Sequence, residues 1–160
     1  MKKRYIRLAQ LAVILFGCTT PLVQLIVVFL AREIGKEAPE VAHLVIPYST
    51  AGVISIGFFQ LFLAGIWYML HRVSTGAFYT AATLRTLDLV RVAFALSVLI
   101  PIGLLLHATF GTETGVGPAS VVLLFLMLIT AGPGVFLLLT VLRQLFIEAR
   151  ANREELEKVI

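Results

Sequence analysis

Three charged residues near the middle of the chain, Arg85, Asp88 and Arg91, are spaced by three. Residues three apart on a helix are neighbours on its surface, so we expect the Asp88 carboxylate to lie between the two guanidinium groups. Two interpretations of this cluster are open. It is a set of paired charges at a membrane interface, whose long side chains reach toward water, or it is a recognition site for an acidic partner or for anionic lipid headgroups.

A second group of polar residues resembles a set of metal ligands. Glu37, Glu40 and His43 are also spaced by three, and His107 and Glu113 are expected at the same end of the molecule. Carboxylates and imidazoles bind divalent metals, but a zinc module has a regular ligand spacing that is missing here, and there is no His-x-x-x-His pair. We therefore expect a solvated polar loop and no metal.

The remaining reactive side chains are scattered along the chain. His43, His71 and His107 have no regularly spaced carboxylate or cysteine partner, and the single cysteine, Cys18, excludes an internal disulfide and a Cys-x-x-Cys pair. The glycine-rich stretch 111–118 follows no strand and carries no nucleotide-binding motif. Catalysis needs a positioned nucleophile, base or metal, so we expect neither an enzyme nor a cofactor.

Four apolar segments must position these residues. Of the 160 residues, 59% are hydrophobic and 14% are charged, which is far more apolar than a soluble domain. A helix needs about 20 apolar residues to cross the hydrocarbon core of a bilayer. The sequence therefore predicts an all-α integral membrane four-helix bundle that forms one domain over residues 1–160, with a cytoplasmic helical extension at 143–160. The predicted spans are residues 11–31, 51–70, 92–110 and 119–142.

The basic residues predict the orientation of the bundle. Eleven of the thirteen Lys and Arg residues lie before the first span, in the polar connection at residues 71–91, or after the last span. Cytoplasmic segments of membrane proteins carry such an excess, so we predict that the polar connection and both termini are cytoplasmic. The net charge of +4 does not indicate direct nucleic-acid binding, because the basic residues lie at the membrane boundaries.

The start of the chain resembles a secretory signal peptide, because a basic segment is followed by an apolar run. The apolar run continues well past Cys18, which is too long for a signal peptide. We therefore predict an uncleaved first span in which Cys18 is a small buried side chain.

Three prolines lie inside the predicted spans: Pro21, Pro101 and Pro133. Proline lacks an N–H and clashes with the carbonyl four residues before it, so we predict a helix kink at each. In lipid the carbonyl freed by Pro21 needs a donor, which the hydroxyl of Thr19 or Thr20 can supply. A broken helix at Pro133 could line a transport site, but no charged residue lies in the centre of any span, which favours a packing kink.

The second span carries residues suited to helix packing. Ser49 or Thr50 is predicted to cap its helix. Gly57 and Gly65 belong to a stripe of small residues at which another helix can approach closely. Gln60 lies near that stripe, and we expect it to hold helices together rather than to bind a substrate.

Two helices are predicted at the cytoplasmic side. Thr80 is the expected N-cap of a helix that continues into the third span, and Phe78 and Tyr79 fit the lipid interface. The fourth span is expected to continue over residues 143–160 with an apolar stripe. Such a stripe lies on the bilayer surface or packs on a partner helix, and both possibilities are open. The stripe consists of Leu142, Leu145, Phe146, Ala149, Leu156 and Val159.

Short motifs in these two helices resemble those of an uncharacterised bacterial family of small four-span membrane proteins. The motifs are Gly76-Ala77-Phe78-Tyr79-Thr80, Leu84-Arg85, Phe146, Ala149, Glu154-Glu155-Leu156 and Val159-Ile160. The resemblance extends over nearly the whole chain and implies a bacterial cytoplasmic membrane. Members of the family are often encoded beside a small Cro-type helix-turn-helix regulator, so the resemblance also implies such a regulator as a partner.

From these features we predict an accessory or regulatory interaction protein that presents its polar connection and C-terminal helix to a partner. The alternative is a channel or transporter subunit for a small solute or an ion. The expected partners are membrane lipids, a cytoplasmic regulator protein and a second copy of the chain. The residues predicted to contact a partner or lipid are Phe78, Tyr79, Arg85, Asp88, Arg91, Arg150 and Arg153.

Overall fold

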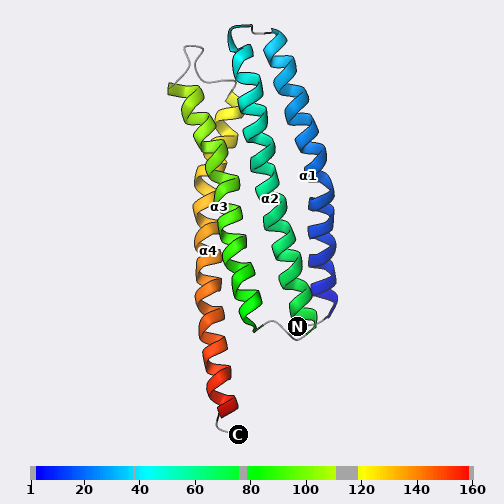
Figure 1. The fold of residues 1–160 in the computed structure, drawn as a ribbon, viewed down its shortest axis with the longest axis vertical. Helices are drawn as coiled ribbons and strands as arrows, with labels where there is room; N and C mark the ends of the chain where they lie inside the picture. Colours follow the sequence, from blue (N-terminus) through cyan, green and yellow to red (C-terminus); the bar gives the residue numbers. More distant parts are fainter. Residues whose placement is uncertain (1–2, 38, 76–78, 111–118, 159–160) are drawn as a thin grey trace.

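A computed structural model describes residues 3–37, 39–75, 79–110 and 119–158, with the side chains of all of these except residues 3, 41, 119–125, 127–128 and 153–158. This described part is helical and contains no strand (Figure 1). Each α-helix includes a segment long and apolar enough to cross a membrane. The prediction of an all-α fold with four spanning helices is therefore confirmed. The elements are α1 (Lys3–Glu37), the 3-10 helix η1 (Pro39–Leu44), α2 (Val45–Ser74), α3 (Ala81–Phe110) and α4 (Ala119–Lys158).

The α-helices extend beyond most of the predicted span ends. The 35 residues of α1 exceed the predicted 11–31 at both ends, because the flanking Lys, Arg and Glu residues are good helix formers. Helix α2 starts at Val45, so the predicted cap at Ser49 or Thr50 is wrong. Ser49 lies inside the helix, where its Oγ donates to the Val45 carbonyl at 2.6 Å.

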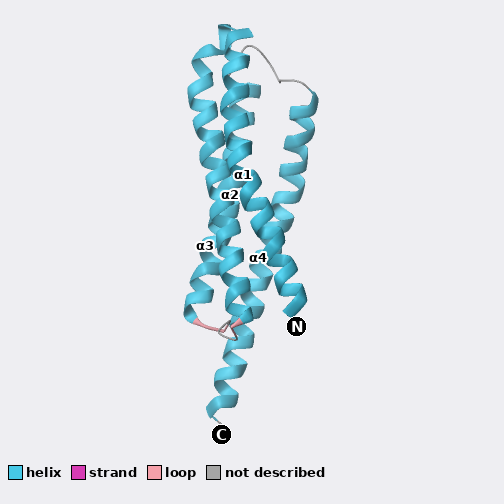
Figure 2. Cartoon of the chain, turned by 90° about the vertical axis from the view of Figure 1, so that its right-hand side faces the viewer, coloured by secondary structure: helices cyan, strands magenta, loops and turns pink. Residues whose placement is uncertain are grey.

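The helices pack in the order of the sequence. Helix α1 packs on α2, α2 on α3 and α3 on α4, and within the described residues the backbones of α1 and α4 do not meet. Figure 1 shows α4 behind α3, and Figure 2 shows the first part of α4 diverging from the other helices. One side of the bundle is therefore open, and a crevice of about 600 Å³ at mid-depth is lined by side chains from all four helices.

Helix α3 provides most of the buried core. Val90, Phe94 and Val98 of α3 form the buried cluster together with Leu139 of α4. Partly buried side chains of α2 pack against this cluster, and the rings of Phe62 and Phe94 lie 5.3 Å apart. Helix α3 packs on α2 and α4, and α2 packs on α1 and α3, so α2 and α3 are the inner helices of the bundle.

Helix α1 exposes most of its apolar surface. Leu15 and Leu25, for example, are 67% and 69% exposed. So large an exposed apolar surface is typical of contact with lipid rather than water, as expected for a multi-pass membrane protein. Cys18 is also exposed, so the prediction that it is buried is wrong. The reason is that, within the described residues, α1 packs on α2 and on no other α-helix, which leaves the rest of its circumference to the bilayer.

Pro21, Pro101 and Pro133 each lie inside a continuous helix. As predicted, a threonine hydroxyl compensates for Pro21: Thr20 Oγ1 donates to the Gly17 carbonyl at 3.0 Å. The carbonyl freed by Pro101 belongs to Ser97, and its donor comes from another helix. The buried hydroxyl of Ser55 on α2 donates to it at 2.8 Å. The predicted bend at each proline stays a prediction.

Small residues allow two close helix contacts with α3. Gly65 of α2 lies against Val90, and Gly132 of α4 lies against Val98, where an added Cβ would come within 2.8 Å of the valine Cγ1. Gly57 faces open space, so its predicted role in helix packing is wrong. Between α1 and α2, Gln60 Nε2 donates to Gln24 Oε1 at 3.1 Å, which confirms the predicted role of Gln60 in holding helices together.

Replacing Gly65 by Ala should loosen the α2–α3 contact, because the new methyl group overlaps the buried side chain of Val90. Overpacking of this kind costs about 1–3 kcal/mol. The matched control is Gly57→Ala, which places a methyl group in open space and gains up to about 1 kcal/mol of helix propensity. Unfolding of the purified protein in mixed micelles, followed by circular dichroism, would measure both. Equal stability of the two variants would contradict the close contact.

Candidate functional site

Most of the charge of the molecule lies at one end of the bundle. The start of α1, the junction of α2 and α3, and the C-terminal half of α4 lie together at this end (Figures 1 and 2). Of the described residues, these segments carry ten basic and five acidic ones, whereas the opposite end carries two basic and three acidic ones. We call this end of the molecule the basic end. Its excess of positive charge attracts anionic groups.

Asp88 is the centre of an ion cluster that joins two helices. Its carboxylate accepts from Arg143 Nε of α4 at 2.5 Å and lies 3.7 Å from Arg91 Nη1. The prediction that Arg85 and Arg91 flank Asp88 is therefore wrong for Arg85, which is exposed and makes no ion pair within the described part of the chain. The reason is that α4 packs beside Asp88 and supplies the second guanidinium from 55 residues away.

Arg91 is held within the contact of α3 with α4. Its guanidinium lies over the ring of Phe136, 5.3 Å from the centroid, and this contact is a cation–π interaction. Its Nε is buried and has no hydrogen-bond partner among the described residues. Asp88, Arg91 and Arg143 thus form a clamp between two helices rather than a free binding surface.

A second arginine joins α2 to α3. Thr80 caps α3 as predicted, since the Thr83 N–H donates to its Oγ1 at 3.4 Å. Arg72 Nη2 donates to the same hydroxyl at 2.7 Å, and its guanidinium lies 5.7 Å from the centroid of the Tyr68 ring. Arg72 was not among the residues predicted from the sequence to form a site. The only signal in the sequence was a basic residue eight positions before a capping threonine.

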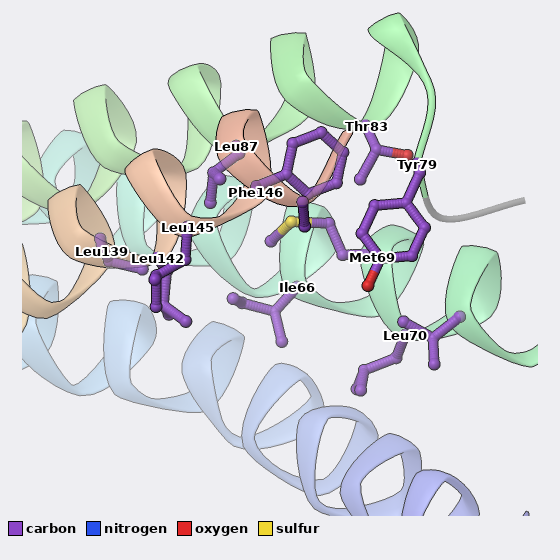
Figure 3. Close-up of a pocket in the computed structure, with 12 residues that line it drawn as sticks. Ile66, Met69, Leu70, Tyr79, Thr83, Leu87, Leu139, Leu142, Leu145 and Phe146 are labelled. Atoms are coloured by element: carbon purple, nitrogen blue, oxygen red, sulfur yellow. The ribbon is translucent and has the colours of Figure 1, made fainter. Parts of the chain in front are cut away.

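An apolar groove opens beside these residues at the basic end (Figure 3). Its volume is about 410 Å³. The groove has α3 as its floor, and α2 and α4 as its walls. We call it the basic-end groove. The side chains that line it are Ile66, Met69, Leu70 and Val73 of α2, Tyr79, Thr83 and Leu87 at the start of α3, and Leu139, Leu142, Leu145, Phe146 and Ala149 of α4.

The groove explains the first half of the apolar stripe of α4. Phe146 is only 5% exposed, and its ring stacks on that of Tyr79 with the centroids 5.7 Å apart. Leu142 and Leu145 line the groove but remain 54% and 55% exposed. Phe146 of this stripe therefore packs on its own bundle, whereas Leu142 and Leu145 stay largely exposed. The side chains of Leu156 and Val159 lie outside the described residues.

The remaining predicted site residues and the candidate metal ligands lie in different parts of the chain. Phe78 and the side chain of Arg153 lie outside the described residues, and Arg150 is half-buried on α4. No group of three or more metal-ligating side chains occurs among the described residues, which do not include Glu113. His107 instead lies 2.8 Å from the Tyr48 hydroxyl and links α3 to α2.

The contact of Asp88 with Arg143 can be tested with a double-mutant cycle. We expect Asp88→Asn and Arg143→Gln to show a small but measurable coupling in unfolding free energy, because the two side chains are 45% and 33% exposed and solvent weakens such a pair. The control cycle pairs Asp88→Asn with Arg85→Gln, for which the coupling should be close to zero. Equal coupling in the two cycles would show that Asp88 interacts no more strongly with Arg143 than with Arg85.

One comparison with known proteins gives a match. Residues 29–160 match a family described as a protein of unknown function (DUF2975). No curated protein and no solved structure matches the chain. The resemblance to an uncharacterised family of small membrane proteins is thereby confirmed, whereas the regulator gene beside it stays a prediction. Since the match covers most of the chain, the chain belongs to the DUF2975 family.

Proposed function

We propose that this chain is a non-enzymatic accessory or regulatory protein of the bacterial cytoplasmic membrane that presents its basic end to a cytoplasmic partner. The observation that carries the proposal is the concentration of basic residues at the end where α4 projects beyond the other helices (Figure 1). A projecting charged helix offers a surface that lipid does not cover. A small helix-turn-helix regulator is one partner that the family resemblance suggests.

The clamp and the exposed basic residues have separate roles in this proposal. Asp88, Arg91 and Arg143 hold α3 and α4 together. Arg85 is exposed in the second turn of α3 and makes no ion pair within the described residues. An exposed charge of this kind steers an oppositely charged partner and contributes to specificity. We therefore assign the first contact with an acidic partner surface to Arg85 and not to the clamp.

Transport remains the second candidate because of the mid-depth crevice lined by all four helices. Thr19, Thr20, Ser55 and Ser97 line it, and each of their hydroxyls donates to a backbone carbonyl. These polar groups therefore serve helix packing already. A transport path also uses charged groups inside the membrane, and the centres of the spans carry none, so we place transport second.

The orientation can be tested with reporter fusions. We expect a fluorescent protein fused after Thr75 or after Ile160 to fluoresce, and alkaline phosphatase fused after Thr114 to be active, because the excess of basic residues retains its end of the bundle in the cytoplasm. Immunoblots would control for the amount of each fusion. Phosphatase activity after Thr75 would place the basic end outside and would rule out a cytoplasmic partner there.

The partner contact can be tested by cross-linking in native membranes. A photoreactive residue at the exposed position Ala82, three residues before Arg85, should capture a cytoplasmic protein. Arg85→Glu should reduce the yield about fivefold, as expected for a loss of about 1 kcal/mol of binding free energy. The matched control is Arg32→Glu, which reverses an exposed arginine at the opposite end. A yield that is independent of Arg85 would contradict the proposed contact.

A further inference from the structure

We propose that the basic-end groove binds one acyl chain of an anionic glycerophospholipid, and that Arg72 binds the phosphate of that lipid. This site is distinct from the proposed partner surface around Arg85. It therefore does not depend on whether a protein partner exists.

The depth of the groove favours a lipid chain as its occupant. Its α2 wall belongs to the candidate membrane span Ala42–Ser74, and its α4 wall belongs to the candidate span Ile129–Asn152. Among the described lining residues, only Tyr79 and Thr83 have polar side-chain groups, and the Thr83 hydroxyl is hydrogen-bonded to that of Thr80 at 3.1 Å. The volume of about 410 Å³ lies within the range of roughly 300–1,000 Å³ of small-molecule sites.

The shape of the groove matches an extended occupant. Helices α2 and α4 both pack on α3, but their backbones do not approach each other within the described residues. Figure 3 shows the lining side chains spread along the helices, with Leu139 at one end and Tyr79 at the other. The half-exposed Leu142 and Leu145 form part of the rim. An acyl chain that lies along the groove would bury the side chains of Leu142 and Leu145.

Arg72 supplies the charge complementarity. It precedes Val73, which lines the groove, and it donates to Thr80, which follows the lining residue Tyr79. Arg72 is half-buried, its Nε is buried without a hydrogen-bond partner, and no carboxylate of the described residues pairs with it. The accessible part of this guanidinium carries a positive charge that no carboxylate among the described residues balances, and an anion bound there would balance it. A guanidinium binds a phosphate through two parallel hydrogen bonds.

The charge of the basic end selects among phospholipids. A zwitterionic lipid brings an ammonium group together with its phosphate, and the excess of basic residues at this end repels that group. An anionic headgroup such as phosphatidylglycerol brings only the negative charge. The site should therefore prefer phosphatidylglycerol to phosphatidylcholine.

Fluorescence quenching can test this preference. Leu145→Trp in a Trp67→Phe background places the only tryptophan on the rim of the groove. In phosphatidylcholine vesicles, a small fraction of phosphatidylglycerol with brominated acyl chains should quench this tryptophan as strongly as about ten times that fraction of brominated phosphatidylcholine. Arg72→Gln should abolish the difference. The matched control Arg7→Gln removes an exposed arginine of α1 at the same end and should preserve it.

Several results would overturn the proposal. Equal quenching by the two lipids would mean that ordinary boundary lipid covers the groove. Loss of the preference in Arg7→Gln as well would mean a general effect of surface charge. Absence of quenching, with disulfide cross-links between copies that carry Leu145→Cys in a Cys18→Ala background, would mean that a second chain occupies the groove.

A second measurement uses the native side chains of the groove. Native mass spectrometry of the detergent-purified wild-type chain, titrated with each lipid, should show about tenfold tighter binding of phosphatidylglycerol. That difference should disappear in Arg72→Gln and return in part in Arg72→Lys, which keeps the charge but loses the paired hydrogen bonds. Size-exclusion chromatography and circular dichroism would establish that each variant is folded. Neither measurement contains a protein partner, so failure here is distinguishable from failure of the proposed function.

Discussion

The bundle depends on the need of every backbone carbonyl in lipid to find a donor. Pro101 removes the N–H that would serve the Ser97 carbonyl, and Ser55 of α2 supplies the replacement from 42 residues away. This repair fixes α2 against α3 at one height and in one rotation. The Gly17 carbonyl, which Pro21 leaves without its helical N–H, accepts from Thr20 of the same helix and needs no donor from a neighbouring helix. Helices α2 and α3 are accordingly tied together inside the bundle, while α1 lies at an edge.

The position of α3 between α2 and α4 also explains the groove at the basic end. Val90 and Val98, two turns apart on α3, receive Gly65 of α2 and Gly132 of α4. These glycines let α2 and α4 approach α3 closely. Within the described residues, no such backbone contact joins α2 to α4 or α1 to α4. Grooves therefore remain where the sides of the helices diverge. In a bilayer such grooves do not stay empty, because acyl chains are the surrounding solvent.

The sequence predicts the features that depend on local interactions. Apolar length predicts the four helices, the Thr80 cap lies three residues from the N–H that it accepts, and Thr20 lies three residues from the carbonyl that it serves. Of the features that depend on tertiary packing, the roles of Gln60 and Gly65 in helix contacts were predicted correctly, but others were wrong or missed. Asp88 turned toward Arg143 rather than Arg85, because no pattern within one helix reveals which neighbour packs beside it. The groove could not be predicted for the same reason, because its two walls are about 75 residues apart in the chain.

The contacts of α4 divide it into an anchored part and a presented part. Going along the helix, it is held by Gly132 against Val98, by Arg143 on Asp88, and by Phe146 on Tyr79. Three successive contacts on one helix fix both its tilt and its rotation. The direction of the residues beyond Ala149 is therefore set by packing inside the bundle. The last two of these contacts lie beside the groove. An occupant of the groove would therefore affect the direction in which α4 leaves the membrane.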